Sequence, residues 1–372
     1  MIRTKWRIGL FFVLISTPVP FANAFYIQTV LSSNCHEKMT ASALGSTGFL
    51  QTPPSPTHYD EVLFDNLQFD AGPFSKDIFT ISLVIGARWN DLHGNSSIDI
   101  DELQQVHNTE SHQREHCLRQ RDQDGEQGNV EAIEDCKDFI REMFENILTT
   151  ATATGSLGPT IRGDFPEYIL YRGTMDVSLS VLYFNAGRAI HAIQDSFSHV
   201  YRTFTTDSAT NLKVIETVLN WPDYVRGEVD ESRDGPEHSF TLDDCECDRT
   251  SSDVTVDTAI EASTEFLALL SDADPSNPDS LDARRARLET FLTDWFTVQP
   301  GCNADNNFCS NASHVEADVD CGDSNDKLGA ESVLGCQVSD SDRSTDSRFL
   351  GGVFVLLLAL VPWFLWRQKK RI

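Results

Sequence analysis

The stretch FNAGRAIHAIQDSFSHVYRTF, residues 184–204, decides how this sequence is interpreted. It spaces His191, Asp195 and His199 four residues apart, so in an α-helix of 3.6 residues per turn the three side chains share one face. Apolar residues flank them, and burying three ionisable groups there is costly unless a cation pairs them. Imidazole and carboxylate four residues apart are typical metal ligands. The stretch therefore predicts a metal-binding helix; the alternative is a polar face whose histidines only bond to carboxylates.

One helix face cannot complete two or three zinc sites, so further ligands must come from other segments. Histidines and an aspartate are available both before and after the helix. They are His36, Asp91, His107, His112, His116 and His238.

Helical periodicity, with apolar residues three and four apart, runs through most of the chain. It covers residues 131–150, 176–204, 209–220, 256–270 and 280–296. Residues 78–85 have the composition of a strand but fit a buried helix equally well. Gly, Pro and Asp mark loops at 155–163 and 222–236. Because alternating strand patterns are scarce, we predict an all-α domain that ends near Pro300, where Asp, Asn, Ser and Cys take over.

The two ends of the chain predict export and anchoring. Residues 1–24 combine a basic start, a short apolar run and a closing Ala-Asn-Ala, which is typical of a signal peptide cut after Ala24. Residues 350–366 are apolar and long enough to span a bilayer core, and the basic tail 367–372 would stay inside. This end resembles bacterial carboxy-terminal sorting tails. We therefore expect a secreted protein, periplasmic or at the cell surface, held by a C-terminal transmembrane helix unless it is processed.

Between these ends the sequence predicts a domain at 25–299 and an acidic, cysteine-containing stalk at 300–349. Nine cysteines in the chain fit an oxidising compartment. Cys117 and Cys136 could pair across a loop. Two local disulfides are the simplest interpretation of the cysteines after residue 300, which are Cys302, Cys309, Cys321 and Cys336.

The charge of the chain excludes one class of partner. There are 57 acidic and 29 basic residues, which gives a formal net charge of -28. Such a surface repels phosphate backbones, so we expect no stable binding to duplex nucleic acid.

Three features of the sequence resemble the zinc-dependent phospholipase C and single-strand nuclease superfamily, in a less studied bacterial-type branch with a carboxy-terminal tail. They are AGRAIHAIQDSFSHV at 186–200, the upstream Trp89-Asn90-Asp91, and His36 followed by a Thr-x-x-Ala helix start. The resemblance covers most of residues 25 to about 270. It implies an all-α fold that holds three zinc ions.

The resemblance also implies which residues bind zinc. The family uses its mature amino-terminal residue, an early His, an upstream Asp and His, the His-x-x-x-Asp helix, a following His, and a later His with a carboxylate. The upstream His is best matched by His107, with His116 as the alternative. The implied ligands are Phe25, His36, Asp91, His107 or His116, His191, Asp195, His199, His238 and Asp243.

The sequence departs from the family pattern in three places. Asp195 and His199 are four residues apart rather than the six of the phospholipases. Leu242 stands where a carboxylate is usual, which leaves Asp243 or Asp244 to replace it, and Phe25 replaces the usual Trp. Two or three Zn²⁺ ions are therefore expected.

The implied activity is metal-assisted hydrolysis of a phosphodiester, with phospholipids as the expected substrates. Asp91 would bind zinc and orient or deprotonate the attacking water, and Asp195 would bridge two metals. Single-strand nuclease activity is the alternative within the superfamily.

A surface protein without catalysis, which keeps zinc or calcium for stability, is an interpretation of a different class. Residues 91–102 (DLHGNSSIDIDE) place several oxygen ligands at EF-hand-like positions. However, Ser96 stands where that loop needs Gly, and His93 is a poor calcium ligand.

Overall fold

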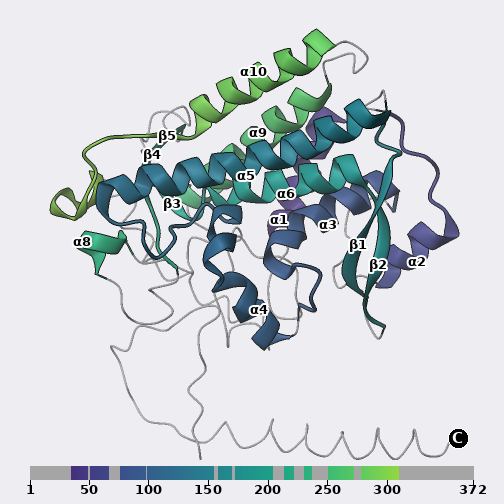
Figure 1. Ribbon diagram of the computed structural model, residues 1–372, viewed down its shortest axis with the longest axis horizontal. Coiled ribbons are helices and arrows are strands. Elements are labelled where there is room, and N and C mark those ends of the chain that lie inside the picture. The colour runs from purple at the N-terminus through teal and green to yellow at the C-terminus, as the bar shows by residue number, and fades with distance from the viewer. Residues whose placement is uncertain are drawn as a thin grey trace, which may run out of the picture. The chain divides into compact units, whose positions relative to one another are not determined.

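Helix α6 (Val181–Asp195) is the innermost element of the structure, since nearly all of its residues are buried. Figure 1 shows the computed structural model of the chain. The residues that it describes are 35–48, 51–66, 76–97, 99–154, 158–169, 172–203, 213–221, 230–236, 250–271 and 278–309. All of them belong to one compact unit, Met1–Cys336.

Four long helices pack directly against α6. They are α1 (Cys35–Thr47), α3 (Ile78–Leu92), α5 (Gly125–Thr154) and α9 (Thr250–Ser271). Helix α10 (Pro278–Trp295) lies outside this layer, on α9 and α5 (Figure 1). The shorter helices are α2 (His58–Asn66), α4 (Ile100–His107) and α8 (Glu231–Asp234), with 3-10 turns η1 (Glu110–Glu115) and η4 (Ala304–Cys309).

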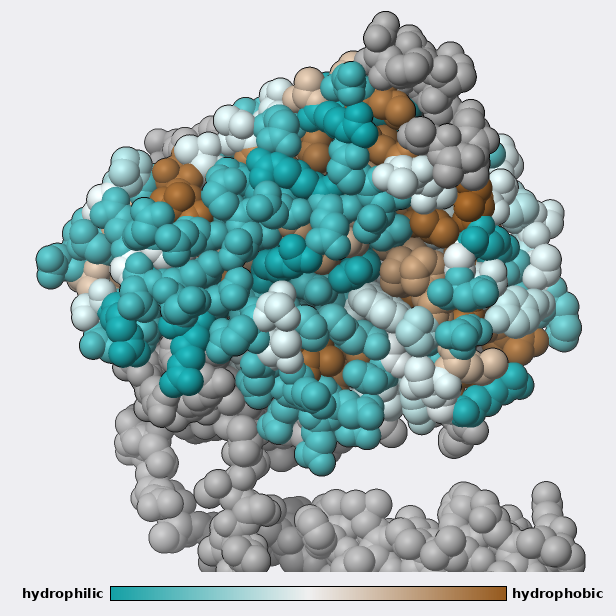
Figure 2. All heavy atoms as spheres, viewed as in Figure 1, coloured by the Kyte–Doolittle hydropathy of each residue, from teal (hydrophilic) through white to brown (hydrophobic). Residues whose placement is uncertain are grey.

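Helix α5 shows how the sequence pattern produces the outer layer. Phe139, Met143 and Ile147 recur every four residues and are all buried, while Asp138 and Glu142, which directly precede the first two, face solvent. Figure 2 shows that hydrophilic side chains cover most of the face formed by α5 and α10, with hydrophobic residues in small separate groups. The helix predicted over 131–150 is therefore confirmed.

Two bidentate ion pairs join α10 to α5. Both Nε and Nη2 of Arg141 lie 2.8 Å from the carboxylate of Glu289. Arg285 holds Glu145 in the same way, at 2.7 and 2.9 Å. Paired nitrogens on paired oxygens fix orientation as well as distance, so they set the register of the two helices.

The described residues also contain strands, so the fold is mostly helical rather than all-α. Strands β1 (Arg162–Ile169) and β2 (Gly173–Ser180) form an antiparallel hairpin. A second sheet has the order β3-β4-β5, with β3 (Val200–Arg202) antiparallel and β5 (Thr297–Val298) parallel to β4 (Val214–Val218).

These strands correct two helix predictions. The helix predicted over 176–204 is only α6, because residues up to Ser180 pair with β1 and residues from Val200 form β3. The helix predicted over 209–220 is wrong where the structure describes it, since 214–218 is strand β4, in which β-branched residues are buried on both faces. The helices over 256–270 and 280–296 are confirmed as α9 and α10, and residues 78–85 form part of α3 rather than a strand.

Helix α3 has defined signals at both ends. The carboxylate of Asp77 accepts hydrogen bonds from the backbone N–H of Phe79 and Thr80 at 2.9 and 3.0 Å, which satisfies the first turn. The helix stops at His93, which takes a left-handed conformation (φ 47°, ψ 35°). The apolar residues between them are buried all round, as expected for a helix enclosed by others.

Helices α3 and α6 cross in close backbone contact at two glycines. A Cβ added to Gly86 would overlap the carbonyl oxygen of Phe184, and one added to Gly187 would overlap the carbonyl oxygen of Leu83. No side chain therefore separates the two backbones at this point. The crossing sets the positions of the residues that follow on both helices, which include Asp91 and His191.

Several predicted segments lie outside the described residues: the signal peptide, the stalk beyond Cys309, the transmembrane segment and the basic tail. Within the described ranges, no helix combines the length and apolar character that a bilayer crossing requires. Of the predicted disulfides, the structure contains Cys302–Cys309 and Cys117–Cys136.

The helix crossing can be tested with a pair of glycine variants. We expect Gly187→Ala to lower the free energy of unfolding by about 3 kcal/mol, because a methyl group there forces the two backbones apart. Gly45→Ala in α1 is the control, since nothing lies within 4 Å of the added methyl, and should stabilise by up to about 1 kcal/mol. Denaturant unfolding measures both; equal effects would contradict the close crossing.

A buried carboxyl in β1 makes stability depend on pH. Burial raises the pKa of Glu167 from 4.5 to about 7, although the charge of Arg88 opposes the shift. Between these values the folded chain keeps a proton that the unfolded chain releases, so stability falls as pH rises through this window.

We expect Glu167→Gln to remove this dependence. The difference in free energy of unfolding between variant and parent should be up to about 3 kcal/mol more favourable to the variant at pH 8 than at pH 4. This figure is the pKa shift of Glu167 converted into free energy. Glu261→Gln, at an exposed position of α9, is the control. Denaturant unfolding of both variants and the parent at both pH values gives the four differences in the free energy of unfolding. If the effect of Glu167→Gln does not change with pH, Glu167 is not the source of the pH dependence.

Candidate metal centre

Seven of the residues predicted as ligands meet where α3 and α6 end. They come from five parts of the chain: α1, α3, α4, the residue after η1, and α6 with the turn that follows it. The seven are His36, Asp91, His107, His116, His191, Asp195 and His199. The side chain of His107 is 12% exposed, and the others are at most 2% exposed.

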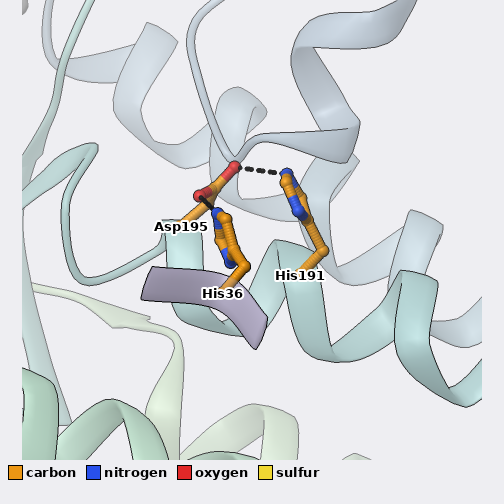
Figure 3. Close-up of side chains that lie close together, drawn as sticks. All are labelled: His36, His191 and Asp195. Carbon is orange, nitrogen blue, oxygen red and sulfur yellow. Dashed lines mark ion pairs between the residues drawn. The ribbon is translucent and has the colours of Figure 1, made fainter. Parts of the chain in front are cut away.

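Asp195, the last residue of α6, presents its two carboxylate oxygens to different imidazoles. Oδ1 lies 3.1 Å from Nε2 of His36, and Figure 3 draws this ion pair together with the one to His191. Oδ2 lies 2.9 Å from Nε2 of His191 and 2.8 Å from Nδ1 of His116. The carboxylate of Asp195 therefore contacts imidazoles through both of its oxygens.

Asp91, near the end of α3, is surrounded by imidazoles without bonding to them. Its Oδ1 lies 3.8 Å from Nε2 of His107, 3.8 Å from Nε2 of His191 and 3.9 Å from Nδ1 of His116. These distances are too long for hydrogen bonds, and neither oxygen of this buried carboxylate has a hydrogen-bond partner in the described part of the chain. Two ligands of a tetrahedral zinc ion lie about 3.4 Å apart, given bonds of about 2.1 Å. The distances of 3.8 to 3.9 Å from Oδ1 of Asp91 to the three nitrogens thus approach the spacing of ligands around a shared ion.

Three of the histidines are oriented by hydrogen bonds at Nδ1. His191 donates to the carbonyl oxygen of Ala87 at 2.6 Å, and His199 donates to that of His116 at 2.6 Å. His36 donates to Oε1 of Gln194 at 2.6 Å. A carbonyl oxygen can only accept, so these contacts place a proton on Nδ1 and make Nε2 the nitrogen that could bind a metal. Metal-binding histidines usually show this pattern.

His199 reaches the centre by a route that the spacing argument did not predict. Helix α6 ends at Asp195, and the backbone N–H of His199 donates to the carbonyl of Asp195 at 2.8 Å across a turn. The carbonyl of His199 in turn accepts from Leu219 at 2.9 Å. The prediction that His199 shares a helix face with His191 is therefore wrong, although its Nδ1 lies 3.9 Å from Oδ2 of Asp195.

The sequence left His107 and His116 as alternatives for one position, and the structure brings both to Asp91. His116 lies deeper, since it also contacts Asp195 and His191. His107 sits at the end of α4, with its Nε2 toward Asp91. Both imidazoles therefore belong to the centre.

Polar residues that the sequence argument missed hold the centre in place. The side-chain amide of Asn90 donates to the carbonyls of Glu115 and Arg188 at 3.2 and 3.1 Å. Arg188 donates to Oδ1 of Asn90 at 3.1 Å and to Oε2 of Glu115 at 3.0 Å. Because Asn90 precedes Asp91 and Glu115 precedes His116, this network fixes two neighbours of the centre. The signal that could have revealed it is a polar Asn inside an otherwise apolar helix.

Burial and mutual charge set the protonation of the centre. Burial would raise the pKa of Asp195, but the surrounding imidazoles of His191, His199 and His36 hold it well below its usual range. Burial would likewise lower the pKa of His36, but the carboxylates of Asp195 and Asp91 outweigh it and raise it to about 9. The pKa of Asp91 is raised by burial. A bound cation would stabilise both carboxylates and displace the proton from His36.

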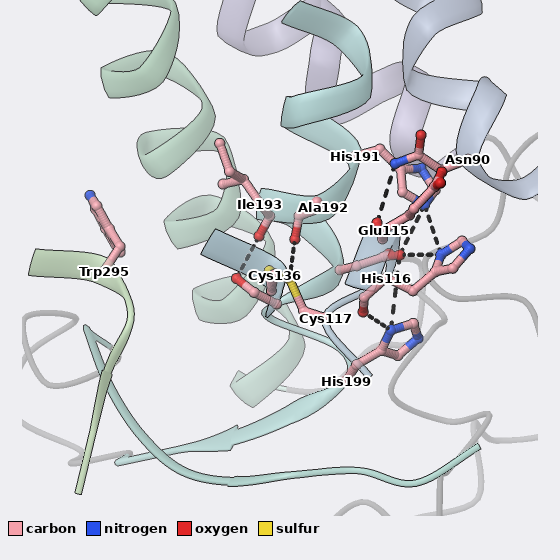
Figure 4. Close-up of a disulfide and its surroundings, with 12 residues drawn as sticks. Asn90, Glu115, His116, Cys117, Cys136, His191, Ala192, Ile193, His199 and Trp295 are labelled. Atoms are coloured by element: carbon pink, nitrogen blue, oxygen red, sulfur yellow. Dashed lines mark hydrogen bonds and ion pairs between the residues drawn. A yellow bond between two sulfur atoms is a disulfide. The ribbon is translucent and has the colours of Figure 1, made fainter. Parts of the chain in front are cut away.

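A disulfide ties the segment of His116 to the core. Cys117 is bonded to Cys136 of α5, and its Sγ lies 3.1 Å from the carbonyl oxygen of Ala192 in α6 (Figure 4). Cys117 takes a left-handed backbone conformation, with φ 51°. His116 is thus held between two helices by its covalent neighbour.

Three predicted ligands lie outside the described residues: Phe25, His238 and Asp243. The EF-hand-like interpretation of 91–102 does not fit the geometry, since Asp91 is buried among imidazoles whereas Asp99 caps α4 by accepting from the N–H of Glu102.

The centre contains two groups of residues that could hold a metal ion. One is His36, His191 and Asp195, and the other is Asp91, His116 and His191. In each group the ligand atoms lie within 4.8 Å of one another. The buried and unbonded oxygens of Asp91 would carry a severe desolvation cost if ionised, which a cation would offset. The residues present therefore fit a metal.

In comparisons with known proteins, no family model, curated protein or solved structure matches this chain. The geometry of the centre carries the functional argument.

The disulfide beside His116 can be tested against the other one. We expect Cys117→Ala with Cys136→Ala to lower the free energy of unfolding by about 3 kcal/mol through loss of a 19-residue cross-link. It should also weaken metal binding at least about tenfold, since His116 loses its anchor.

The matched control is Cys302→Ala with Cys309→Ala, which removes a seven-residue cross-link in η4. This pair should cost about 2 kcal/mol and leave metal affinity unchanged. Denaturant unfolding and competition with a chelator are the measurements. Equal metal affinities in both double variants would show that the disulfide does not position His116.

Proposed function

We propose that this protein is a zinc-dependent phosphodiester hydrolase of the phospholipase C and single-strand nuclease type. The observation that supports this most directly is the carboxylate of Asp91, whose Oδ1 lies 3.8 to 3.9 Å from three imidazole nitrogens without a hydrogen bond. A cation placed among this oxygen and the three nitrogens would give the carboxylate the partner that it lacks among the described residues.

The donor set favours zinc over calcium or magnesium. Imidazole nitrogens outnumber carboxylates in the centre, and such mixed nitrogen and oxygen ligands suit Zn²⁺, whereas Ca²⁺ and Mg²⁺ take oxygen ligands. His36, His191 and Asp195 would hold one ion, and Asp91 with His116 would hold a second. His107 lies beside the second set, with its Nε2 3.8 Å from Oδ1 of Asp91.

When bound, zinc ions supply Lewis acidity toward a phosphoryl oxygen and make water acidic enough to attack near neutral pH. The chain's own part is to orient and to move protons. Asp91 has two oxygens, so one can hold the ion while the other accepts a proton from the attacking water. Asp195 fixes the imidazoles of His36 and His191 by contacting one with each of its oxygens.

Phospholipids are the proposed substrates, with single-strand nucleic acid as the alternative. The chain has a formal net charge of -28, which disfavours a long polyanion more than a single phosphodiester. The proposed export signal at 1–24 and the proposed membrane anchor at 350–366 would place the enzyme next to lipid.

A second candidate function is a metal-stabilised surface protein without catalysis. The near-complete burial of the centre favours it, since His36, His191 and Asp195 have no exposed side-chain surface among the described residues. Structural metal sites are closed, whereas catalytic ones keep a position for water. The two candidates differ in turnover rather than in metal content.

The test combines metal content with turnover in the full chain. We expect two or three zinc ions per chain by elemental mass spectrometry, and release of a phospholipid head group. Asp195→Asn should lose at least one ion and more than about 100-fold in activity, because residues outside the coordination sphere alone account for about 10- to 100-fold. Asp257→Asn, an exposed carboxylate of α9, should change neither.

The outcomes separate the candidates. Release of nucleotides rather than head groups would favour the nuclease. Zinc that falls in Asp195→Asn without any turnover in the parent would favour the stabilised surface protein. Zinc near zero in the parent would refute the metal centre itself.

A further inference from the structure

We infer that His93, His112 and Glu115 form a second, solvent-facing site for a zinc-class divalent cation beside the buried centre. This site shares no residue with the centre. Each of the three residues offers one ligand atom, and these atoms lie within 4.8 Å of one another.

The three side chains are already gathered in contact. Nε2 of His93 lies 3.3 Å from Oε2 of Glu115. The imidazoles of His93 and His112 stack with their centroids 4.1 Å apart. Two imidazoles and one carboxylate form a ligand set that catalytic-type zinc sites use, with a fourth position left for water.

The backbone at His93 is held in an uncommon conformation that brings its ring to this place. His93 ends α3 with φ 47° and ψ 35°, a left-handed geometry that favours Gly or Asn. The backbone N–H of His93 donates to the carbonyl of Trp89 at 2.6 Å. The His93 imidazole also stacks on the Trp89 indole, with the ring centroids 6.2 Å apart. This helix-ending turn fixes where the His93 side chain leaves the backbone.

The other two residues are oriented as ligands would be. Nδ1 of His112 donates to the carbonyl of Val106 at 3.0 Å, which leaves the lone pair on Nε2. Oε2 of Glu115 accepts from Arg188 at 3.0 Å. Outer hydrogen bonds of this kind fix the direction of metal ligands.

Exposure distinguishes this site from the centre. The side chain of His93 is 23% exposed and that of Glu115 is 8% exposed, and His112 is half-buried. An ion here can exchange with solvent, and Arg188 shares the carboxylate with it. The site should therefore bind more weakly than the centre and release its ion first.

The experiment titrates Zn²⁺ into the full chain after the tight sites are filled. The variants are His93→Asn and His112→Asn. Asn tolerates the left-handed backbone at position 93, and at position 112 its amide N–H can replace the Nδ1 donor to Val106 while Nε2 is lost. Glu115 is left unchanged because it precedes His116. His58→Asn, whose parent side chain is 91% exposed in α2, is the control.

We expect the parent and His58→Asn to show one weaker zinc-binding event by calorimetry. Each of the other two variants should weaken this event at least tenfold, with the tightly held zinc unchanged by elemental mass spectrometry. Asp195→Asn should retain the weaker event, so a failure of the proposed hydrolase would not remove it. Identical titrations of the parent and of both histidine variants would show an ion pair and ring stack without metal, and would overturn the inference.

Discussion

The close crossing of α3 and α6 is the contact on which the site depends. Because Gly86 and Gly187 leave no side chain between the backbones, the carbonyl of Ala87 can accept a hydrogen bond from His191. Each helix carries a buried carboxylate at its end, Asp91 as the second-last residue of α3 and Asp195 as the last residue of α6. Helix C-termini carry negative partial charge, so the crossing gathers two such ends and two carboxylates in one place. A cation is the simplest counter-charge for this arrangement.

Hydrogen bonds to backbone carbonyls orient the imidazoles more than contacts between the imidazoles do. Carbonyls of Ala87 and His116 fix the rings of His191 and His199, and rigid elements supply these carbonyls. Such orientation is set before any ligand arrives, which lowers the ordering cost of binding. It also accounts for Asn90, which lies beside the centre without belonging to either metal-capable group and is buried and hydrogen-bonded.

The sequence predicts the parts of the site that depend on local spacing, and less of what depends on tertiary contact. His191 and Asp195 follow from helical periodicity, and His36 and Asp91 were implied by the family resemblance. His199 was found by spacing, but it lies beyond a turn because α6 ends at Asp195. Strand β4 was mistaken for a helix because its buried β-branched residues carry no alternation. The network around Asn90 joins segments 25 and 98 residues apart, a distance that no local pattern encodes.

The most exposed imidazole of the centre lies on the side of α4. Among the described ligands, His107 of α4 is the most exposed, and its nitrogen faces Asp91 rather than Asp195. Glu115, which ends η1, is adjacent in the chain to His116 and belongs to the more exposed cluster of histidines. Both carboxylates of the centre are closed to solvent, since the side chain of Asp91 is 1% exposed and that of Asp195 is 0% exposed. The two carboxylates therefore differ in their contacts rather than in their exposure, since Asp195 lies within 3.1 Å of three imidazoles whereas Asp91 stands 3.8 to 3.9 Å from three of them.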